Sequence, residues 1–187
     1  MLGTARLLTR SLADARVSVG LSWRNLGHAF ANRNEQRPVD PRQWGVLYLG
    51  ASKLGDKTNR PSKNPLIAVG RNGEPFADQR ASLAGLQGLV ALDGNWAQAK
   101  ALWWRNAWLT RLRRLVVVPD APSLYGDLRR EARPDAVSTL EAVALALSVL
   151  ERDATVRDRL TAPFRELIKR AKAAGIRDSK RDRRSRR

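Results

Sequence analysis

The chain contains no cysteine and a single histidine, His28, among its 187 residues. Disulfide-linked partners and thiolate zinc sites are therefore excluded, and one histidine is too few for a histidine metal cluster. The sequence also lacks any apolar run near the roughly 20 residues that span a bilayer, and its first residues lack the apolar core of a signal peptide. We therefore predict a cytoplasmic protein with no bound metal and no membrane segment.

The chain contains far fewer acidic residues than basic ones. The chain has 35 Lys and Arg against 18 Asp and Glu, which gives a net charge of +17 and a sequence pI near 11.5. Residues 169–187 hold ten basic and two acidic side chains, and the rest of the chain still carries +9. Such a field favours a polyanion, most often nucleic acid. A solvated basic surface with a disordered tail is the alternative, and an anionic membrane surface is a weaker one.

The composition that remains is that of a folded domain, with 43% hydrophobic residues. We expect one domain over residues 1–175 and a disordered basic tail over 176–187, where Ile176 is the last apolar residue. Continuous apolar runs predict strands over 44–49, 66–69, 89–92 and 115–118. Amphipathic patterns predict helices over 3–12, 77–86, 96–109, 138–152 and 155–173. This alternation indicates an α/β fold, in which a mainly parallel sheet has helices on both faces.

Two motifs contain polar residues of the kinds used in catalysis and ligand binding. One is a strand-to-helix turn, and the other is the start of a helix. In the first, the apolar run 88–92 ends at Asp93, and a tight turn leads to Trp96. The second is Ser138-Thr139-Leu140-Glu141-Ala142. Ligands of open α/β folds bind outside the carboxyl ends of the strands, so both motifs could line one site.

The second motif has two interpretations. Ser138 and Glu141 have the spacing of a reciprocal N-terminal capping box, and capping alone could explain both residues. A helix start is also an anion site, because its free N–H groups and its dipole favour a ligand carboxylate.

The helix predicted over 96–109 is rich in tryptophan. Apolar residues recur on one predicted face at Ala97, Ala101, Trp104 and Trp108. We expect Trp104 and Trp108 to pack in the core, because aromatic stripes at helical spacing usually face the sheet. Trp103 lies off this stripe and Trp96 lies at the turn, so these two are better placed to meet a ligand.

In order and spacing, these motifs resemble those of the DTW-domain family, within the wider SPOUT-like group. The resemblance covers most of the chain and is carried by Phe164 and by residues 3–8, 47–48, 92–99, 123–130 and 138–142. Asn95 stands where the family usually has threonine, which leaves Asp93 and Trp96 in place but removes a hydroxyl. The chain is also expected to lack the strand and the cysteine cluster that often precede the Gly3-Thr4-Ala5-Arg6 segment in similar members.

The resemblance implies a SPOUT-like fold with a C-terminal trefoil knot. It also implies transfer of the 3-amino-3-carboxypropyl group of S-adenosyl-L-methionine to a uridine in tRNA, with release of methylthioadenosine. Three alternatives stay open: an rRNA target, a noncatalytic RNA-binding protein, and a SPOUT-type RNA methyltransferase.

Site residues follow from this resemblance together with the position of Asp93 at a strand end and the basic charge of the chain. Asp93 is expected to be catalytic, with a helix N-cap as its alternative role. Residues expected to contact S-adenosylmethionine are Thr4, Trp96, Ala99, Val117, Val118, Pro119, Ser138, Thr139 and Glu141. Residues expected to contact RNA are Lys53, Lys57, Arg60, Lys63, Tyr125, Arg129 and Arg130, although a solvated charged surface would also explain the basic ones.

Overall fold

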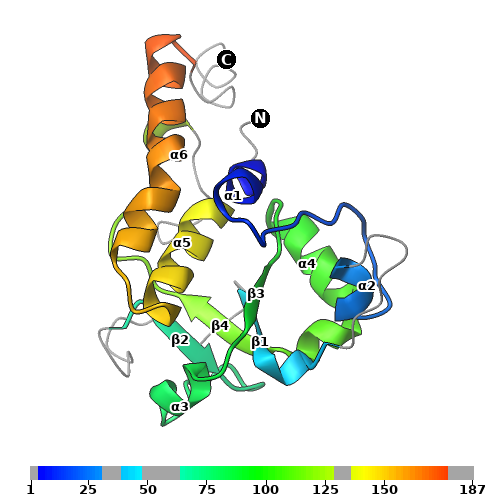
Figure 1. The fold of residues 1–187 in the computed structure, drawn as a ribbon. Helices are drawn as coiled ribbons and strands as arrows, with labels where there is room; N and C mark the ends of the chain where they lie inside the picture. Colours follow the sequence, from blue (N-terminus) through cyan, green and yellow to red (C-terminus); the bar gives the residue numbers. More distant parts are fainter. Residues whose placement is uncertain (1–3, 31–38, 48–63, 129–135, 177–187) are drawn as a thin grey trace, which may run out of the picture.

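The sheet of this protein is mixed and mainly parallel. The computed structural model describes residues 4–30, 39–47, 64–128 and 136–176. Within these residues the strands are β1 (Trp44–Leu47), β2 (Leu66–Val69), β3 (Gly88–Ala91) and β4 (Arg113–Val117), in the order β2-β4-β1-β3 (Figure 1). β1 runs parallel to both β3 and β4, and β2 runs antiparallel to β4 at the edge. The prediction of a mainly parallel sheet is confirmed, and the antiparallel edge strand is an addition to it.

The five predicted helices are present in the described residues, four with shorter bounds and the last with the predicted ones. They are α1 (Ala5–Ser11), α3 (Gln79–Leu83), α4 (Trp96–Arg105), α5 (Thr139–Leu150) and α6 (Thr155–Ala173). The structure adds α2 (Leu26–Phe30) and three short 3-10 helices, η1 (Pro41–Gln43), η4 (Ala107–Arg111) and η5 (Gly126–Leu128). The knot implied by the resemblance stays a prediction. None of the described helices combines the length and the apolar character that crossing a bilayer requires.

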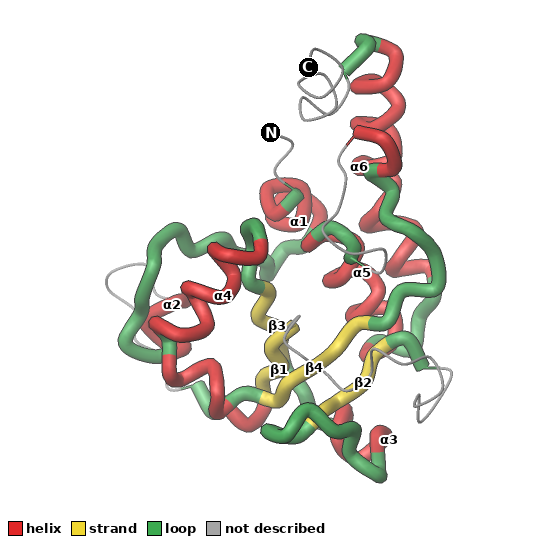
Figure 2. Tube along the Cα trace, turned by 180° about the vertical axis from the view of Figure 1, so that it is seen from behind, coloured by secondary structure: helices red, strands yellow, loops and turns green. Residues whose placement is uncertain are grey.

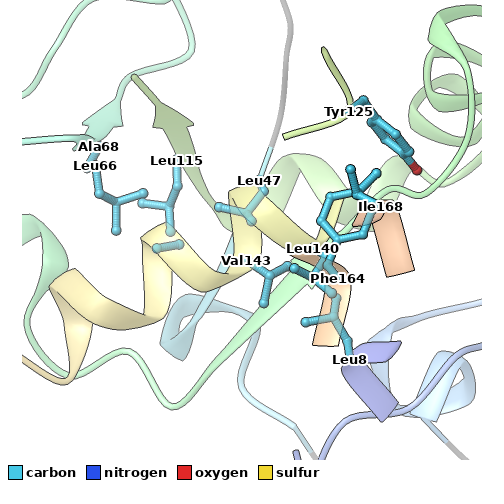
Figure 3. Close-up of a cluster of buried hydrophobic side chains, with 11 residues drawn as sticks. Leu8, Leu47, Leu66, Ala68, Leu115, Tyr125, Leu140, Val143, Phe164 and Ile168 are labelled. Carbon is cyan, nitrogen blue, oxygen red and sulfur yellow. The ribbon is translucent and has the colours of Figure 1, made fainter. Parts of the chain in front are cut away.

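One face of the sheet packs against α1, α5 and α6. Figure 3 shows how side chains from these helices meet those from the strands: Leu8, Leu47, Leu66, Ala68, Leu115, Leu140, Val143, Phe164 and Ile168. This face of the sheet has no room for a side chain at position 45. At Gly45 a Cβ atom would lie 2.4 Å from Cδ1 of Leu115, so only glycine leaves room for that leucine on the neighbouring strand.

The opposite face packs against α2, α4 and η4, which gives three layers (Figure 2). Its core is Leu26, Val46, Trp103, Leu109 and Leu112. Side chains alternate between the faces along a strand, and accordingly Val46 belongs to this core while Leu47 belongs to the other. Helices on both faces of the sheet are therefore confirmed.

The predicted orientations of Trp103 and Trp104 are wrong, whereas Trp96 is exposed and Trp108 packs against the core as predicted. Trp103 is 6% exposed and lies in the core, whereas Trp104 is 72% exposed. The physical cause is that the predicted stripe joins Trp104 to Trp108 within one helix, whereas α4 ends before Trp108. The helix α4 ends at Arg105 with Asn106 as its C-cap, and Trp108 lies in η4, so the position of Trp108 does not show which face of α4 is buried.

Asn106 itself is a buried polar residue that ends the helix, with 1% of its surface exposed. Its Nδ2 donates to the carbonyl oxygens of Leu102 at 2.8 Å and of Leu21 at 3.1 Å. Its Oδ1 accepts from the backbone N–H of Trp23 at 2.8 Å and from Nε1 of Trp108 at 3.3 Å. Since a buried amide is costly unless its hydrogen bonds are made, these bonds fix the segment around Leu21 against the end of α4.

Candidate functional site

The carboxyl ends of the three parallel strands lie at one edge of the sheet. β1 ends at Leu47, β3 at Ala91 and β4 at Val117. Asp93 follows β3 closely, and Val118 and Pro119 follow β4. The starts of α4 and α5 and the helix α1 gather beside the end of β3 (Figures 1 and 2). The predicted motifs therefore lie at the edge where α/β proteins bind ligands.

The two motifs touch each other directly. Thr139 Oγ1 donates a hydrogen bond of 2.7 Å to Oδ1 of Asp93, across a separation of 46 residues in the sequence. The expectation that both motifs lie in one place is confirmed by this contact. Asp93 is exposed and Thr139 is partly buried, so the bond orients a carboxylate that solvent can still reach.

Asp93 does not cap α4, and the alternative role considered for it is wrong. The cap is Asn95, whose Oδ1 accepts from Gln98 N at 3.0 Å while Gln98 Oε1 accepts from Asn95 N at 2.8 Å. Gly94 makes this geometry accessible, with a φ of 144° that side-chain-bearing residues rarely adopt. Asparagine is among the best N-caps, so Asn95 is well suited to this position. The Asn95-x-x-Gln98 spacing was the signal for this cap in the sequence.

The capping box predicted at the start of α5 is present. Ser138 Oγ accepts from Glu141 N at 3.2 Å, and Glu141 Oε2 accepts from Ser138 N at 3.0 Å. Glu141 has a second task that the sequence did not reveal. Its Oε2 accepts from Ser123 Oγ at 2.8 Å, and its Oε1 accepts from Leu124 N at 2.7 Å. These contacts favour the capping interpretation of Ser138 and Glu141 over direct ligand contact.

Replacing Glu141 with glutamine is expected to lower the free energy of unfolding by about 1–3 kcal/mol, because hydrogen bonds to an ionised carboxylate are lost or weakened. Urea denaturation measures this loss. The matched control is Glu166→Gln, since Glu166 has an exposed ion pair with Arg170 at 2.8 Å, and such pairs contribute about 0.5 kcal/mol or less. Equal losses in the two variants would contradict the anchoring role of Glu141.

Tyr125 does not lie where RNA could stack on it. It is 3% exposed, and its ring packs edge-to-face on Phe164 with the centroids 5.0 Å apart (Figure 3). This burial argues against the predicted RNA contact and makes Tyr125 part of the core. The other residues predicted to contact RNA lie outside the described residues: Lys53, Lys57, Arg60, Lys63, Arg129 and Arg130.

Of the residues predicted to bind the co-substrate, three lie at the starts of α1 and α4. Thr4 precedes α1 and is 5% exposed, and its hydroxyl makes no capping hydrogen bond. Trp96 is the first residue of α4 and is 40% exposed, and Ala99 is partly buried one turn further along. Leu8 of α1 packs in the same core cluster as Leu140 of α5, which keeps α1 beside the start of α5.

The segment after β4 is held in place by hydrogen bonds to two other parts of the chain. Val118 N donates to the carbonyl oxygen of Pro65 at 2.8 Å, so this amide is committed within the chain. Arg157 of α6 holds Asp120 with two parallel hydrogen bonds of 2.7 and 2.8 Å. The hydrogen bond from Arg157 keeps the pKa of Asp120 below its ordinary value, and the same bond raises the pKa of Arg157. This pair, which the sequence analysis missed, fixes the course of the chain beyond Pro119.

No group of three or more His, Cys, Asp or Glu side chains that could hold a metal ion occurs in the described parts of the chain. The absence of a metal therefore stays a prediction from composition.

Comparison with known proteins places these motifs in context. A family model described as the DTW domain matches residues 1–172. A protein of Drosophila melanogaster named tRNA-uridine aminocarboxypropyltransferase 2 is 37% identical over 104 residues, which are 56% of this chain and 41% of that protein. A Mus musculus protein of the same name is 32% identical over 79 residues, or 42% of this chain and 26% of the relative. Each match spans less than half of the relative's length. No solved structure matches the chain.

Proposed function

Because the chain belongs to the DTW-domain family, we propose that it transfers the 3-amino-3-carboxypropyl group of S-adenosylmethionine to a uridine in tRNA. The single observation that carries this proposal is the Asp93–Thr139 hydrogen bond of 2.7 Å, which unites two family motifs at the carboxyl edge of the sheet. The names of the fly and mouse relatives support the same reaction and the same RNA class.

Asp93 is assigned the role of proton acceptor. The N3–H of uracil is a weak acid, and N3 becomes a nucleophile when that proton is removed. An exposed carboxylate can accept the proton, and the bond from Thr139 Oγ1 holds it in one orientation. S-Adenosylmethionine supplies an electrophilic γ-carbon beside its sulfonium, so transfer releases methylthioadenosine. The chain must present that carbon in line with N3, which is a task of positioning.

The residues around Asp93 fit the co-substrate by size and polarity. The half-exposed indole of Trp96 offers a flat apolar surface to the methionine chain, and Ala99 leaves space one helical turn away. The buried hydroxyl of Thr4, which is free of a capping bond, suits the carboxylate of that chain. The backbone of Val117, Val118 and Pro119 would surround adenosine, with carbonyl oxygens rather than the committed amide of Val118.

Affinity for tRNA is assigned to the basic charge of the chain. A net charge of +17 favours binding to phosphates without sequence preference. Basic residues of segments 53–63, 129–130 and 176–187 are the proposed phosphate contacts, and the predicted cytoplasmic localisation agrees with a tRNA substrate.

The test is the small-molecule product formed from S-adenosylmethionine and unmodified tRNA. We expect methylthioadenosine from the full chain, with a tRNA fraction that gains the mass of the aminocarboxypropyl group. S-Adenosylhomocysteine would instead mean methyl transfer, and the absence of both would mean binding without catalysis. Product with rRNA but not with tRNA would move the target to the ribosome.

A further inference from the structure

The outer surface of α4 carries a tryptophan that is not part of the hydrophobic core. Trp104 is 72% exposed, although tryptophan usually buries most of its surface in a folded protein. Trp96, Lys100 and Trp104 follow one another at intervals of four residues, so they lie along one side of the helix, and Lys100 is exposed between the two tryptophans. Trp104 lies outside the core, whereas Trp103, one residue earlier and so about 100° round the helix, is buried in it.

A second apolar side chain lies at the end of this row. Asn106 binds the carbonyl oxygen of Leu21 at 3.1 Å, and Ser22 Oγ donates to the carbonyl oxygen of Arg105 at 3.2 Å. The segment of Leu21 is thus fastened beside the last turn of α4, and Leu21 is itself exposed. We call Lys100, Trp104, Arg105 and Leu21 the Trp104 face.

The charge of this region selects the kind of partner. The segment of α4 and η4, residues 96–111, contains Lys100, Arg105 and Arg111 and no acidic residue, and residues 15–30 contain Arg16 and Arg24 and no acidic one. An aromatic ring among positive charges suits a polyanion that also has flat apolar groups. Single-stranded RNA has both, in its phosphates and in its unstacked bases.

We propose that the Trp104 face binds an unpaired stretch of the substrate RNA by stacking a base on Trp104 while Lys100 and Arg105 contact phosphates. The proposal deepens the function proposed above and rests on it for the identity of the RNA. The helix rise places Trp104 roughly 12 Å along α4 from Trp96, a few nucleotides of unstacked chain. RNA held there leads along α4 to the turn with Asp93, so the face would direct the nucleotides next to the reacting uridine.

The decisive variant is Trp104→Leu, which keeps an apolar side chain and removes the aromatic ring. Its binding to single-stranded oligouridine is expected to be about 5- to 150-fold weaker, since a stacked base contributes that much to affinity. Trp104→Phe should keep most of the affinity, because a phenyl ring still stacks. The probes are oligouridine and an RNA duplex of equal length, and fluorescence anisotropy of the labelled RNA gives the dissociation constants.

Binding to the duplex provides the internal control. Its bases are already stacked, so Trp104→Leu should leave duplex affinity unchanged, whereas Lys100→Gln should weaken both probes and lower the salt dependence of binding by about one phosphate contact. A matched control is Ile176→Ala, which removes an exposed apolar side chain at the end of α6 and should change neither affinity. Circular dichroism and thermal melting establish that each variant is folded.

Three results would overturn the proposal. Oligouridine affinity could be unchanged in Trp104→Leu, or it could fall equally for both probes, and either result would exclude base stacking. Light scattering could show that the wild type is a dimer and Trp104→Leu a monomer with undiminished RNA affinity, which would make the face a contact between copies of the chain.

The test separates this proposal from the proposed function. If the wild type forms no methylthioadenosine but Trp104→Leu still loses oligouridine binding, the result supports the RNA-binding surface and contradicts the proposed reaction. If methylthioadenosine forms and Trp104→Leu leaves KM for tRNA unaltered, the result supports the proposed reaction and contradicts the RNA-binding surface. Support for both requires a raised KM with kcat at saturating tRNA preserved.

Discussion

Replacing Asp93 with asparagine is expected to lower kcat for aminocarboxypropyl transfer by about 10²–10⁴-fold, the usual contribution of a positioned general base. The amide oxygen of asparagine can still accept the 2.7 Å hydrogen bond from Thr139, so the contact between the two motifs survives. The neutral amide, however, cannot take the proton of uracil N3. Single-turnover formation of methylthioadenosine measures the chemical step, and calorimetry should show nearly unchanged affinity for S-adenosylmethionine.

Two further variants isolate the reason for the loss. Thr139→Val keeps the carboxylate and removes its hydrogen-bond donor, so it should reduce turnover less than Asp93→Asn does. Asp78→Asn is the matched control, because Asp78 is another aspartate at a turn, caps α3 through a 2.9 Å bond to Ala81 N, and leads into the opposite end of β3. It should leave turnover unchanged. Unchanged turnover in Asp93→Asn with a lowered melting temperature would instead make Asp93 a structural residue.

Replacing Phe164 with alanine is expected to lower the free energy of unfolding by about 3–5 kcal/mol, the range for emptying a large aromatic site in a core. Phe164 is 0% exposed, and it packs against Tyr125 on the segment that Glu141 anchors. Urea denaturation followed by fluorescence measures the change. The matched control is Phe76→Ala, since Phe76 is exposed and its removal should cost about 1 kcal/mol or less.

A loss near 1 kcal/mol at Phe164 would contradict the central place given to it, and would mean that neighbouring side chains collapse into the space. The expected loss would identify Phe164 as a structural residue of the core. Its contribution is to hold α6 and the Tyr125 segment against the sheet.

The sequence by itself was sufficient for the layered α/β architecture and for the edge at which the motifs meet. Continuous apolar runs marked β1 to β4, because strands covered on both faces need no polar side. The parallel pairing of β1 with β3 and β4 brings their carboxyl ends together, so Asp93 and the start of α5 could be expected at one place. Local signals also sufficed for the capping box of Ser138 and Glu141, since capping depends on residues three apart.

Only the tertiary structure decided which individual side chains face the core and which remain accessible. Periodicity gives the face of a helix only when its end is known, and the end of α4 depends on Asn106, which binds a segment 85 residues away. Trp103 is buried because it packs with Leu26 and Val46 from other elements, and Trp104 remains exposed. The bond from Thr139 to Asp93 and the anchoring of Leu124 by Glu141 likewise join residues 46 and 17 positions apart. Such contacts are set by the packing of whole elements, whereas the pattern within a segment reports only on its own backbone.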